Sequence, residues 1–323
     1  MTFAPTCKAV VTALALAYSG LCAAEAAYPS KMIKLIIPYA PGGLSDGIVR
    51  AVAEELDRTH KMKVIIENRT GGNTVPAALG VTKAAPDGYT LGWFSGSTFT
   101  TVPALTPGLP FKNAEFQPVF LAYRGPIVMA VTNSVAATNA AEYIGISKRE
   151  GRPALVGATA KGGAGHLMAA ALGVDAGVAV ELVGYRGGPP MVLDLVGGQL
   201  TAGIDILDTF LAQHQAKKLR IIGHTGAKRL AVLPEVQTFA EAGFPEVRGK
   251  FWHGLFAPAG TPPAIVNLLN ERFNAAMRAP AVVARLSPDL EVVPLSPKDF
   301  EKHIDQDVAY WKSIIGKTGV KID

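Results

Sequence analysis

Two glycine-rich segments have residue types that could bind an anion through the backbone. They are residues 37–43, IPYAPGG, and residues 158–165, ATAKGGAG. Each follows a segment that favours a strand and precedes one that favours a helix. Glycine permits close approach of a ligand, and a helix N-terminus offers unpaired N–H groups with about half a positive charge.

Two such helix ends that face one another across a cleft would bind a small anion. A carboxylate is favoured over a phosphate because the sequence has no cluster of arginines. The alternative is that both segments are ordinary strand-to-helix turns.

Two aspartates lie where a carboxylate could shape the binding site or contact a ligand. Asp46 could cap the helix that follows the first segment, or hold the glycine loop by hydrogen bonding. Asp205 lies near the end of an apolar segment, residues 202–206, where a carboxylate needs a partner. That partner could be an ammonium or hydroxyl group of a ligand, or the amide of a loop.

The elements that would position these residues alternate between strands and helices. The first block predicts strands at residues 32–38, 64–67 and 89–94, an amphipathic helix with its N-cap at Ser45 or Asp46, and a helix at 77–85. The second block predicts helices at 142–148, 166–172 and 190–196, and strands at 154–156, 178–183, 202–206 and 218–224. This order predicts an α/β fold with largely parallel sheets.

The apolar segments 129–131 and 251–257 flank the second block and are candidates for two strands that cross between domains. Later helices, at residues 262–277 and 297–315, add no new strands and are expected to cover the first domain. The sequence therefore predicts a second domain, 128–253, inserted into a first domain made of 27–127 and 254–323. The two crossing strands would form a hinge.

The N-terminus has the order of features found in a secretory signal peptide. Lys8 precedes an uncharged segment, residues 9–24, that is shorter than the roughly 20 residues of a membrane span. Ala24-Glu25-Ala26 matches a cleavage site, so residues 1–26 are expected to be removed near Ala26 during export to the periplasm. The alternatives are a buried N-terminal helix, or a lipid on Cys22, for which the preceding leucine is a poor match.

Composition argues against several classes of protein. Cleavage would remove both cysteines of the chain, which excludes disulfides and cysteine nucleophiles from the product. Aromatic residues are 7%, the net charge is +5 and no Lys/Arg run exceeds two residues, so a nucleic-acid partner is not expected. Hydrophobic residues at 49% and charged residues at 18% indicate a globular chain.

Sequence motifs of common enzyme classes are not matched. Residues 92–96 have the wrong spacing for a nucleophile elbow, and 163–168 lack the last glycine of a dinucleotide loop. Residues 157–163 end in Gly-Gly where a P-loop needs a lysine. The histidines are far apart, with no i, i+4 pair. We therefore expect no catalytic residue, no cofactor and no metal.

Many ordered motifs closely resemble those of the tripartite tricarboxylate transporter substrate-binding proteins, often called Bug receptors. They are residues 28–33, 36–46, 67–69, 84–91, 185–187, 194–199, 233–236, 241–243 and 257–262. The resemblance covers essentially the whole chain after the signal segment.

The resemblance implies a periplasmic receptor of the type II periplasmic binding protein architecture, in which a two-strand hinge joins two lobes with mostly parallel sheets. Such a receptor, expected as a monomer, would close on a small carboxylate ligand, an organic acid or amino acid, and present it to membrane transporter subunits. A sensor that signals to a membrane kinase is an alternative. An exported enzyme, such as a hydrolase, is a third.

The resemblance also implies ligand-binding positions in both domains. The expected residues are Tyr39, Ala40, Gly42, Gly43, Asp46, Ser95, Thr98, Thr159, Gly162, Gly163, His166, Tyr185 and Asp205. His166 could instead anchor its helix. The second loop departs from the family pattern at Ala160, where glycine is usual, and at Gly163, where a hydroxyl is usual, so the resemblance does not identify the ligand.

Overall fold

The structure is a computed structural model that describes residues 28–159, 162–185 and 187–321. The expected signal peptide, with Cys22 and the cleavage site near Ala26, lies outside the described residues, as do Ala160, Lys161 and Arg186. Within the described ranges, no helix combines the length and the apolar character needed to cross a membrane.

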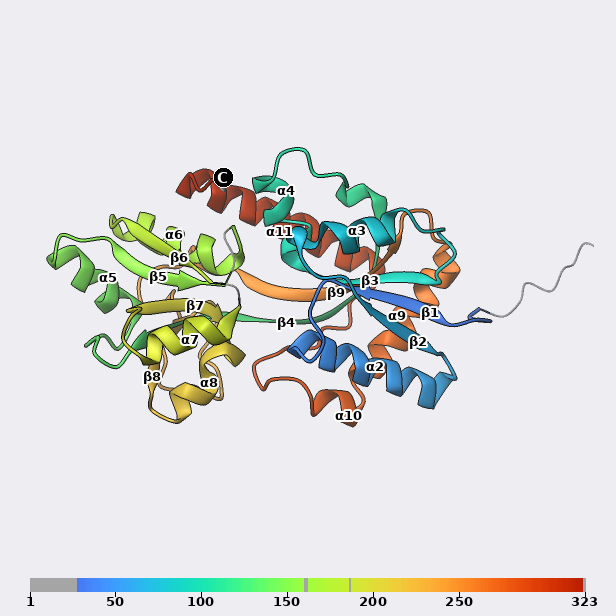
Figure 1. Cartoon of the computed structure of the whole chain (residues 1–323), viewed down its shortest axis with the longest axis horizontal. Coiled ribbons are helices and arrows are strands. Elements are labelled where there is room, and N and C mark those ends of the chain that lie inside the picture. The colour runs from blue at the N-terminus through green and yellow to red at the C-terminus, as the bar shows by residue number, and fades with distance from the viewer. Residues whose placement is uncertain (1–27, 160–161, 186, 322–323) are drawn as a thin grey trace, which may run out of the picture.

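The first lobe is built on strand β1 (Ile33–Ile37), which pairs in parallel with β2 (Val64–Asn68) and β3 (Thr90–Ser95) (Figure 1). Its helices are α2 (Leu44–His60), α3 (Val75–Thr82), α4 (Thr101–Leu105), α9 (Pro263–Met277) and α10 (Pro280–Val283). Short 3-10 turns lie at η2 (Gly72–Thr74), η3 (Gly96–Thr98) and η4 (Asn113–Glu115).

The second lobe repeats this arrangement. Strand β5 (Ala154–Ala158) pairs in parallel with β6 (Val180–Gly184) and β7 (Ala202–Ile206). Its remaining elements are α5 (Ala140–Arg149), α6 (Ala164–Ala176), α7 (Gly188–Val196), α8 (Leu207–Gln215) and β8 (Leu219–His224). The parallel pairing in each lobe follows from the strand–helix–strand order of the sequence.

Two long strands run from one lobe to the other, as Figure 1 shows. Strand β4 (Phe116–Thr132) pairs antiparallel with β9 (Lys250–Pro258) as far as Pro126, and with β7 from Ile127 onward. The expected crossing strands are therefore confirmed, although each is longer than its most apolar part. The expected α/β fold of two lobes is also confirmed. Antiparallel pairing between the described strands involves β4 and β9, β3 and β7 beside them, and β8.

The last helix, α11 (Pro297–Thr318), contacts both lobes. Phe300 and Ile304 pack into a core of the first lobe, whereas Trp311 and Ile314 pack into a core of the second. A helix of 22 residues is about 33 Å long, which is enough to span both. The domain limits stay a prediction, but they would assign α11 wholly to the first domain, and its C-terminal turns pack against the second.

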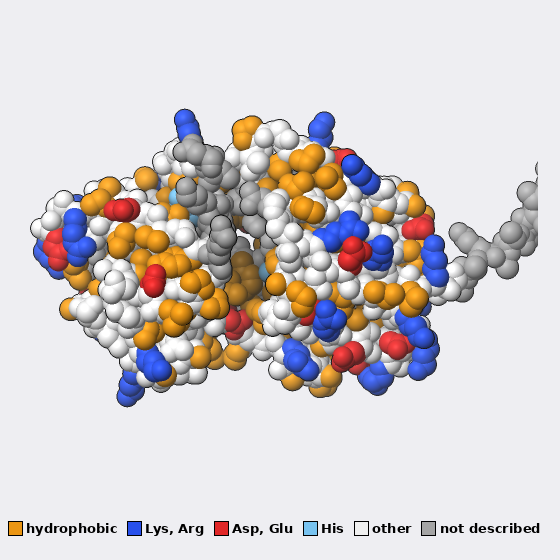
Figure 2. All heavy atoms as spheres, viewed as in Figure 1, with side chains coloured by type: hydrophobic (Ala, Val, Ile, Leu, Met, Phe, Trp, Pro, Cys, Tyr) orange, Lys and Arg blue, Asp and Glu red, His pale blue; other side chains and the backbone are white. Residues whose placement is uncertain are grey.

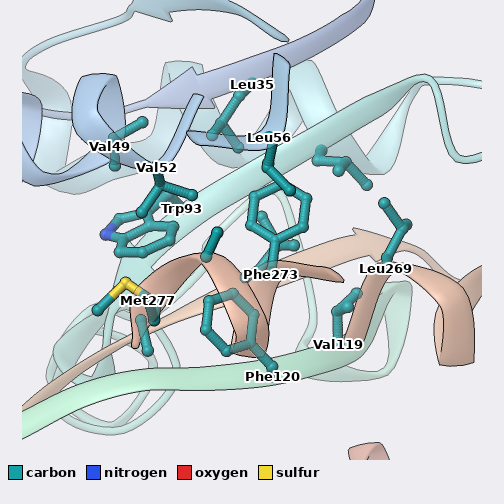
Figure 3. Close-up of a cluster of buried hydrophobic side chains, with 14 of the residues drawn as sticks. Leu35, Val49, Val52, Leu56, Trp93, Val119, Phe120, Leu269, Phe273 and Met277 are labelled. Atoms are coloured by element: carbon teal, nitrogen blue, oxygen red, sulfur yellow. The ribbon is translucent and has the colours of Figure 1, made fainter. Parts of the chain in front are cut away.

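Apolar residues three and four apart place α2 over the first sheet. Val49, Val52 and Leu56 point from one face of α2 toward Trp93 of β3 and Phe273 of α9 (Figure 3). All five side chains are fully buried. This packing fixes the N-terminal end of α2, and with it the glycine loop that precedes the helix.

Candidate functional site

A cavity of about 440 Å³ lies between the lobes, and a hollow is visible there in Figure 2. Its wall includes the N-terminal ends of α2 and α6, the end of β7, the start of β9 and one face of α11. Segments far apart in the sequence therefore meet at one cavity, as is common for ligand sites between two domains.

The loop before α2 is held in shape by Asp46. Gly42 has φ of +83°, a conformation that favours glycine, and its N–H donates to Asp46 Oδ2 at 2.9 Å. Arg50 donates to both carboxylate oxygens at 2.8 and 3.0 Å. Asn68 donates to Asp46 and to the carbonyl of Tyr39 at 3.0 and 2.9 Å.

The expectation that Ser45 or Asp46 caps α2 is wrong. The helix begins at Leu44 with Gly43 as its N-cap, and no side chain caps it. Asp46 is only 3% exposed and turns back toward Gly42, and the hydrogen bonds from Arg50 hold the pKa of its carboxyl well below the usual range. Asp46 thus holds the loop, the other role considered for it, and is outside the cavity wall.

The loop before α6 has the same conformation in its described part. Gly162 has φ of +73°, and its N–H donates to His166 Nδ1 at 2.9 Å. Gly163 is the N-cap of α6, with φ −74° and ψ 171°, against φ −76° and ψ 170° for Gly43. Neither helix has a side-chain cap, so both expose unpaired N–H groups at ends that line the cavity.

Hydroxyl groups line the cavity at the end of β3. Ser95 Oγ and Ser97 Oγ lie 2.8 Å apart, and both residues are in the wall with Thr100 and Thr101. Thr98 is fully buried instead and lies outside the wall, where its Oγ accepts a 3.4 Å hydrogen bond from Thr74.

Two aspartates also line the cavity. Asp205 accepts a 3.0 Å hydrogen bond from Thr209, and burial raises the pKa of its carboxyl to about 6. Asp307 of α11 accepts a 2.7 Å hydrogen bond from Trp252 Nε1, and burial raises its pKa to about 6 as well.

A histidine forms part of the wall near the first loop. His253 of β9 lies between Ser95 of β3 and Tyr123 of β4 in the sheet. Its Nε2 is 3.3 Å from Ser45 Oγ, which is also 3.2 Å from Tyr123 Oη. Burial lowers the pKa of His253 to about 3, so its ring is neutral at pH 7.

The residues expected from the sequence fall into three groups. Those in the cavity wall are Tyr39, Ala40, Gly43, Ser95, Thr159, Gly163 and Asp205. Those that form or hold the two loops are Gly42, Asp46, Gly162 and His166. Thr98 and Tyr185 lie apart from the wall, and Tyr185 donates a 2.7 Å hydrogen bond to Asp194.

Sequence reasoning missed the part of the wall that β9 and α11 provide. Residues 250–253 were expected only as a crossing strand, and α11 only as a cover for the first domain. One signal was available, because Asp307 and Trp311 are four residues apart and share a helix face. No group of three or more His, Cys, Asp or Glu among the described residues could hold a metal ion.

Comparisons with known proteins agree on one family. The model of the family described as "Tripartite tricarboxylate transporter family receptor" matches residues 48–320. The chain is 31% identical over 319 residues to Protein BugT of Bordetella pertussis (strain Tohama I), covering 97% of each. It is 33% identical to a UPF0065 protein from the tcbD-tcbE intergenic region of Pseudomonas sp. (strain P51), covering 80% of this chain and 78% of that protein.

Solved structures give the same result. R. palustris Rpa4515 with adipate matches with a TM-score of 0.81 and 30% identity, over 91% of this chain and 99% of that one. MatC from Rhodopseudomonas palustris with bound malate matches with a TM-score of 0.77 and 26% identity, over 89% of this chain and 100% of that one. The periplasmic binding protein BugD matches with a TM-score of 0.78 and 27% identity, over 91% and 99%.

Proposed function

Since this chain belongs to the tripartite tricarboxylate transporter receptor family, we propose that it is a periplasmic solute-binding receptor. It captures a small molecule that carries a carboxylate in the cavity between its lobes. It then presents that molecule, chemically unchanged, to the subunits of a membrane transporter.

The observation that carries this proposal is the pair of uncapped helix ends in one cavity wall. Gly43 and Gly163 are the N-caps of α2 and α6, which belong to different lobes, and both line the cavity. Each hydrogen bond to a charged group contributes about 1.5–3 kcal/mol, and micromolar affinity needs about 8 kcal/mol after association costs of order 4–15 kcal/mol. Several N–H and hydroxyl donors from the two loops and from Ser95 suffice for that.

The bound ligands of two similar structures support a carboxylate as the ligand class. One similar protein holds adipate and another holds malate, as their descriptions state. The helix ends and hydroxyls of this chain offer donors suited to the carboxylate group that both molecules share.

The mechanism of capture is closure about the crossing strands. A ligand that contacts α2 of one lobe and α6 of the other gains contacts only when the lobes approach, so it stabilises the closed form by its differential affinity. Strand β4 passes between the lobes at Pro126 and Ile127, where its pairing changes from β9 to β7. A bend there would leave both sheets intact.

Export and the transporter partner are parts of the same proposal. The signal segment at residues 1–26 supports delivery to the periplasm. Affinity capture with the ligand-bound receptor, from membranes of the source cell, should recover integral membrane transporter subunits. Recovery of a sensor kinase instead would favour the alternative role.

A ligand screen tests the binding function. Thermal shift and calorimetry on the purified mature chain should be run with di- and tricarboxylates, amino acids and aromatic acids, and with the matching neutral amides as controls. At least one carboxylate should raise the melting temperature and bind with micromolar affinity or better, whereas its amide should not. Failure of every carboxylate to bind would overturn the proposed function.

A further inference from the structure

We propose that the cavity selects a ligand with a single carboxylate whose other end carries an ammonium or hydroxyl donor on an apolar body, and that it discriminates against dicarboxylates. This inference rests on the proposed function, because it assumes that one carboxylate binds at the helix ends. It differs from the chemistry of adipate and malate, which carry two carboxylates each.

Asp307 places an acceptor in the cavity wall on an element other than the two glycine loops. It lies on α11, and its carboxyl accepts the Trp252 indole N–H at 2.7 Å. The side chain is half-buried, and the indoles of Trp252 and Trp311 both hydrogen-bond its carboxyl. A ligand carboxylate that approaches Asp307 would lose its hydration and meet a like charge, whereas an ammonium or hydroxyl would donate to it.

Asp205 provides a second acceptor from the other lobe. It lies at the end of β7, where Thr209 satisfies Oδ2 at 3.0 Å, and its neighbour Ile206 is also in the wall. Two carboxylates from different elements therefore border one cavity. Protein groups already donate to both carboxylates, but a further anion brought against them would be costly, whereas a ligand that brings donors or positive charge would be stabilised there.

The positive charge in the described part of the wall is already paired. Lys250 is the one lysine or arginine among the described residues that line the cavity, and its Nζ lies 3.5 Å from Glu291. A second ligand carboxylate would have to compete with Glu291 for that ammonium. This arrangement favours one negative charge on the ligand over two.

Aromatic and aliphatic side chains form much of the remaining wall. Phe251, Trp252 and Trp311 contribute rings, and Leu44, Ile127 and Ile206 contribute aliphatic surface. Such a surface stabilises the apolar body of a ligand, and aromatic faces also attract a cation. The wall thus combines N–H and hydroxyl donors that suit a carboxylate with apolar surface and the two acceptors Asp205 and Asp307.

The test uses ligands that differ only at one end. Calorimetry at pH 8, which keeps Asp205 and Asp307 ionised, should compare 6-aminohexanoate, 6-hydroxyhexanoate, hexanoate and adipate. A rigid aromatic pair, 4-(aminomethyl)benzoate and benzene-1,4-dicarboxylate, repeats the comparison in a second shape. We expect the ammonium compound of each set to bind at least tenfold more tightly than the dicarboxylate.

Isosteric variants assign the selectivity to the two aspartates. Asp205→Asn and Asp307→Asn keep an oxygen that can accept a hydrogen bond from Thr209 or Trp252, but they remove the negative charge. Each variant should therefore reduce the ratio of the affinity for the ammonium ligand to the affinity for the dicarboxylate at least threefold. Asp289→Asn is the matched control, because Asp289 is also a largely buried carboxyl but lies outside this cavity. It should leave the ratio unchanged.

Every outcome bears on the proposal. Equal or tighter binding of the dicarboxylates, or a ratio that the two cavity variants leave unchanged, would overturn this inference while the proposed receptor function stands. Binding of none of these probes would also overturn it. Only failure of the whole carboxylate screen would overturn the receptor function itself, so the two failures are distinguishable.

Discussion

Gly42 and Gly162 occupy the same place in two loops that belong to different lobes. Each has positive φ, and each donates its N–H at 2.9 Å to a side chain four residues later, Asp46 in one loop and His166 in the other. In both loops the sequence is Gly-Gly, and the residue three positions after the second glycine carries a side chain that accepts the hydrogen bond. One backbone conformation at both helix ends thus results from two chemically different anchors.

Asp46→Asn should lower the free energy of unfolding by about 2 kcal/mol at pH 7, since the charged hydrogen bonds from Arg50 and Gly42 each contribute about 1.5–3 kcal/mol. The folded pKa lies below the usual 3.8, so this stabilisation is present above pH 3.8 and is lost as the pH falls further. Urea unfolding measures the difference in unfolding free energy between the wild type and Asp46→Asn. That difference should be about 1 kcal/mol smaller at pH 3 than at pH 7.

Asp57→Asn serves as the control on the same helix, because the Asp57 side chain is exposed. Its effect should stay within about 0.5 kcal/mol at pH 7. If Asp46→Asn were equally mild, the carboxylate would not be what holds the first loop.

His166 should act on ligand affinity by positioning the second loop. His166→Ala removes the acceptor for Gly162 N–H and should weaken binding of the tightest carboxylate of the screen at least tenfold. His166→Asn places an oxygen near the position of Nδ1 and should retain affinity within about threefold, since the hydrogen bond is kept. Calorimetry measures the ligand affinity of both variants. An equal loss of affinity in the two would show that this hydrogen bond does not set the affinity.

His253 should make stability depend on pH. Its folded pKa of about 3 lies below the unfolded value of 6.5, so the unfolded chain gains a proton that the folded chain does not as the pH falls. The stability present above pH 6.5 is therefore lost on acidification. Relative to His253→Gln, the wild-type chain should lose up to about 2.7 kcal/mol between pH 7 and pH 4.5.

Urea unfolding of both proteins at the two pH values measures how the difference between their unfolding free energies changes with pH. The contributions of the other titrating groups are common to both proteins and cancel. The glutamine retains a polar nitrogen that can reach Ser45. This limits the part of the difference in unfolding free energy that does not depend on pH. An offset that is the same at pH 7 and pH 4.5 would contradict a buried, neutral His253.

The sequence predicted what local patterns determine. Alternating strand and helix signals located the parallel strands, and the Gly-Gly pairs located both loops of the cavity wall. The start of α2 was missed because Asp46 looks like a cap in the sequence. Only the structure shows that its side chain turns back to Gly42.

The rest of the wall depends on tertiary packing. His253, Asp307 and Trp311 reach the cavity because β9 crosses between the lobes and α11 spans both. No local pattern encodes that arrangement. Tyr185 shows the converse, since it follows β6 directly but hydrogen-bonds Asp194 away from the cavity wall.

The central claim is that the N-terminal ends of α2 and α6 bind the ligand together. Gly43→Val and Gly163→Val test it, because both residues have negative φ, and a Cβ on Gly43 would meet no atom closer than Ala40 O at 3.6 Å. Gly162 is less suited, since its φ of +73° would strain any side chain. Gly47→Val is the control, because Gly47 has free space around it and lies outside the cavity wall.

Calorimetric titration of these three variants with the tightest carboxylate is the most direct measurement. Valine at either helix end should weaken binding at least a hundredfold, with melting temperatures within a few degrees of the wild type, while Gly47→Val stays within threefold. Wild-type affinity in Gly43→Val or in Gly163→Val would contradict capture between the two helix ends.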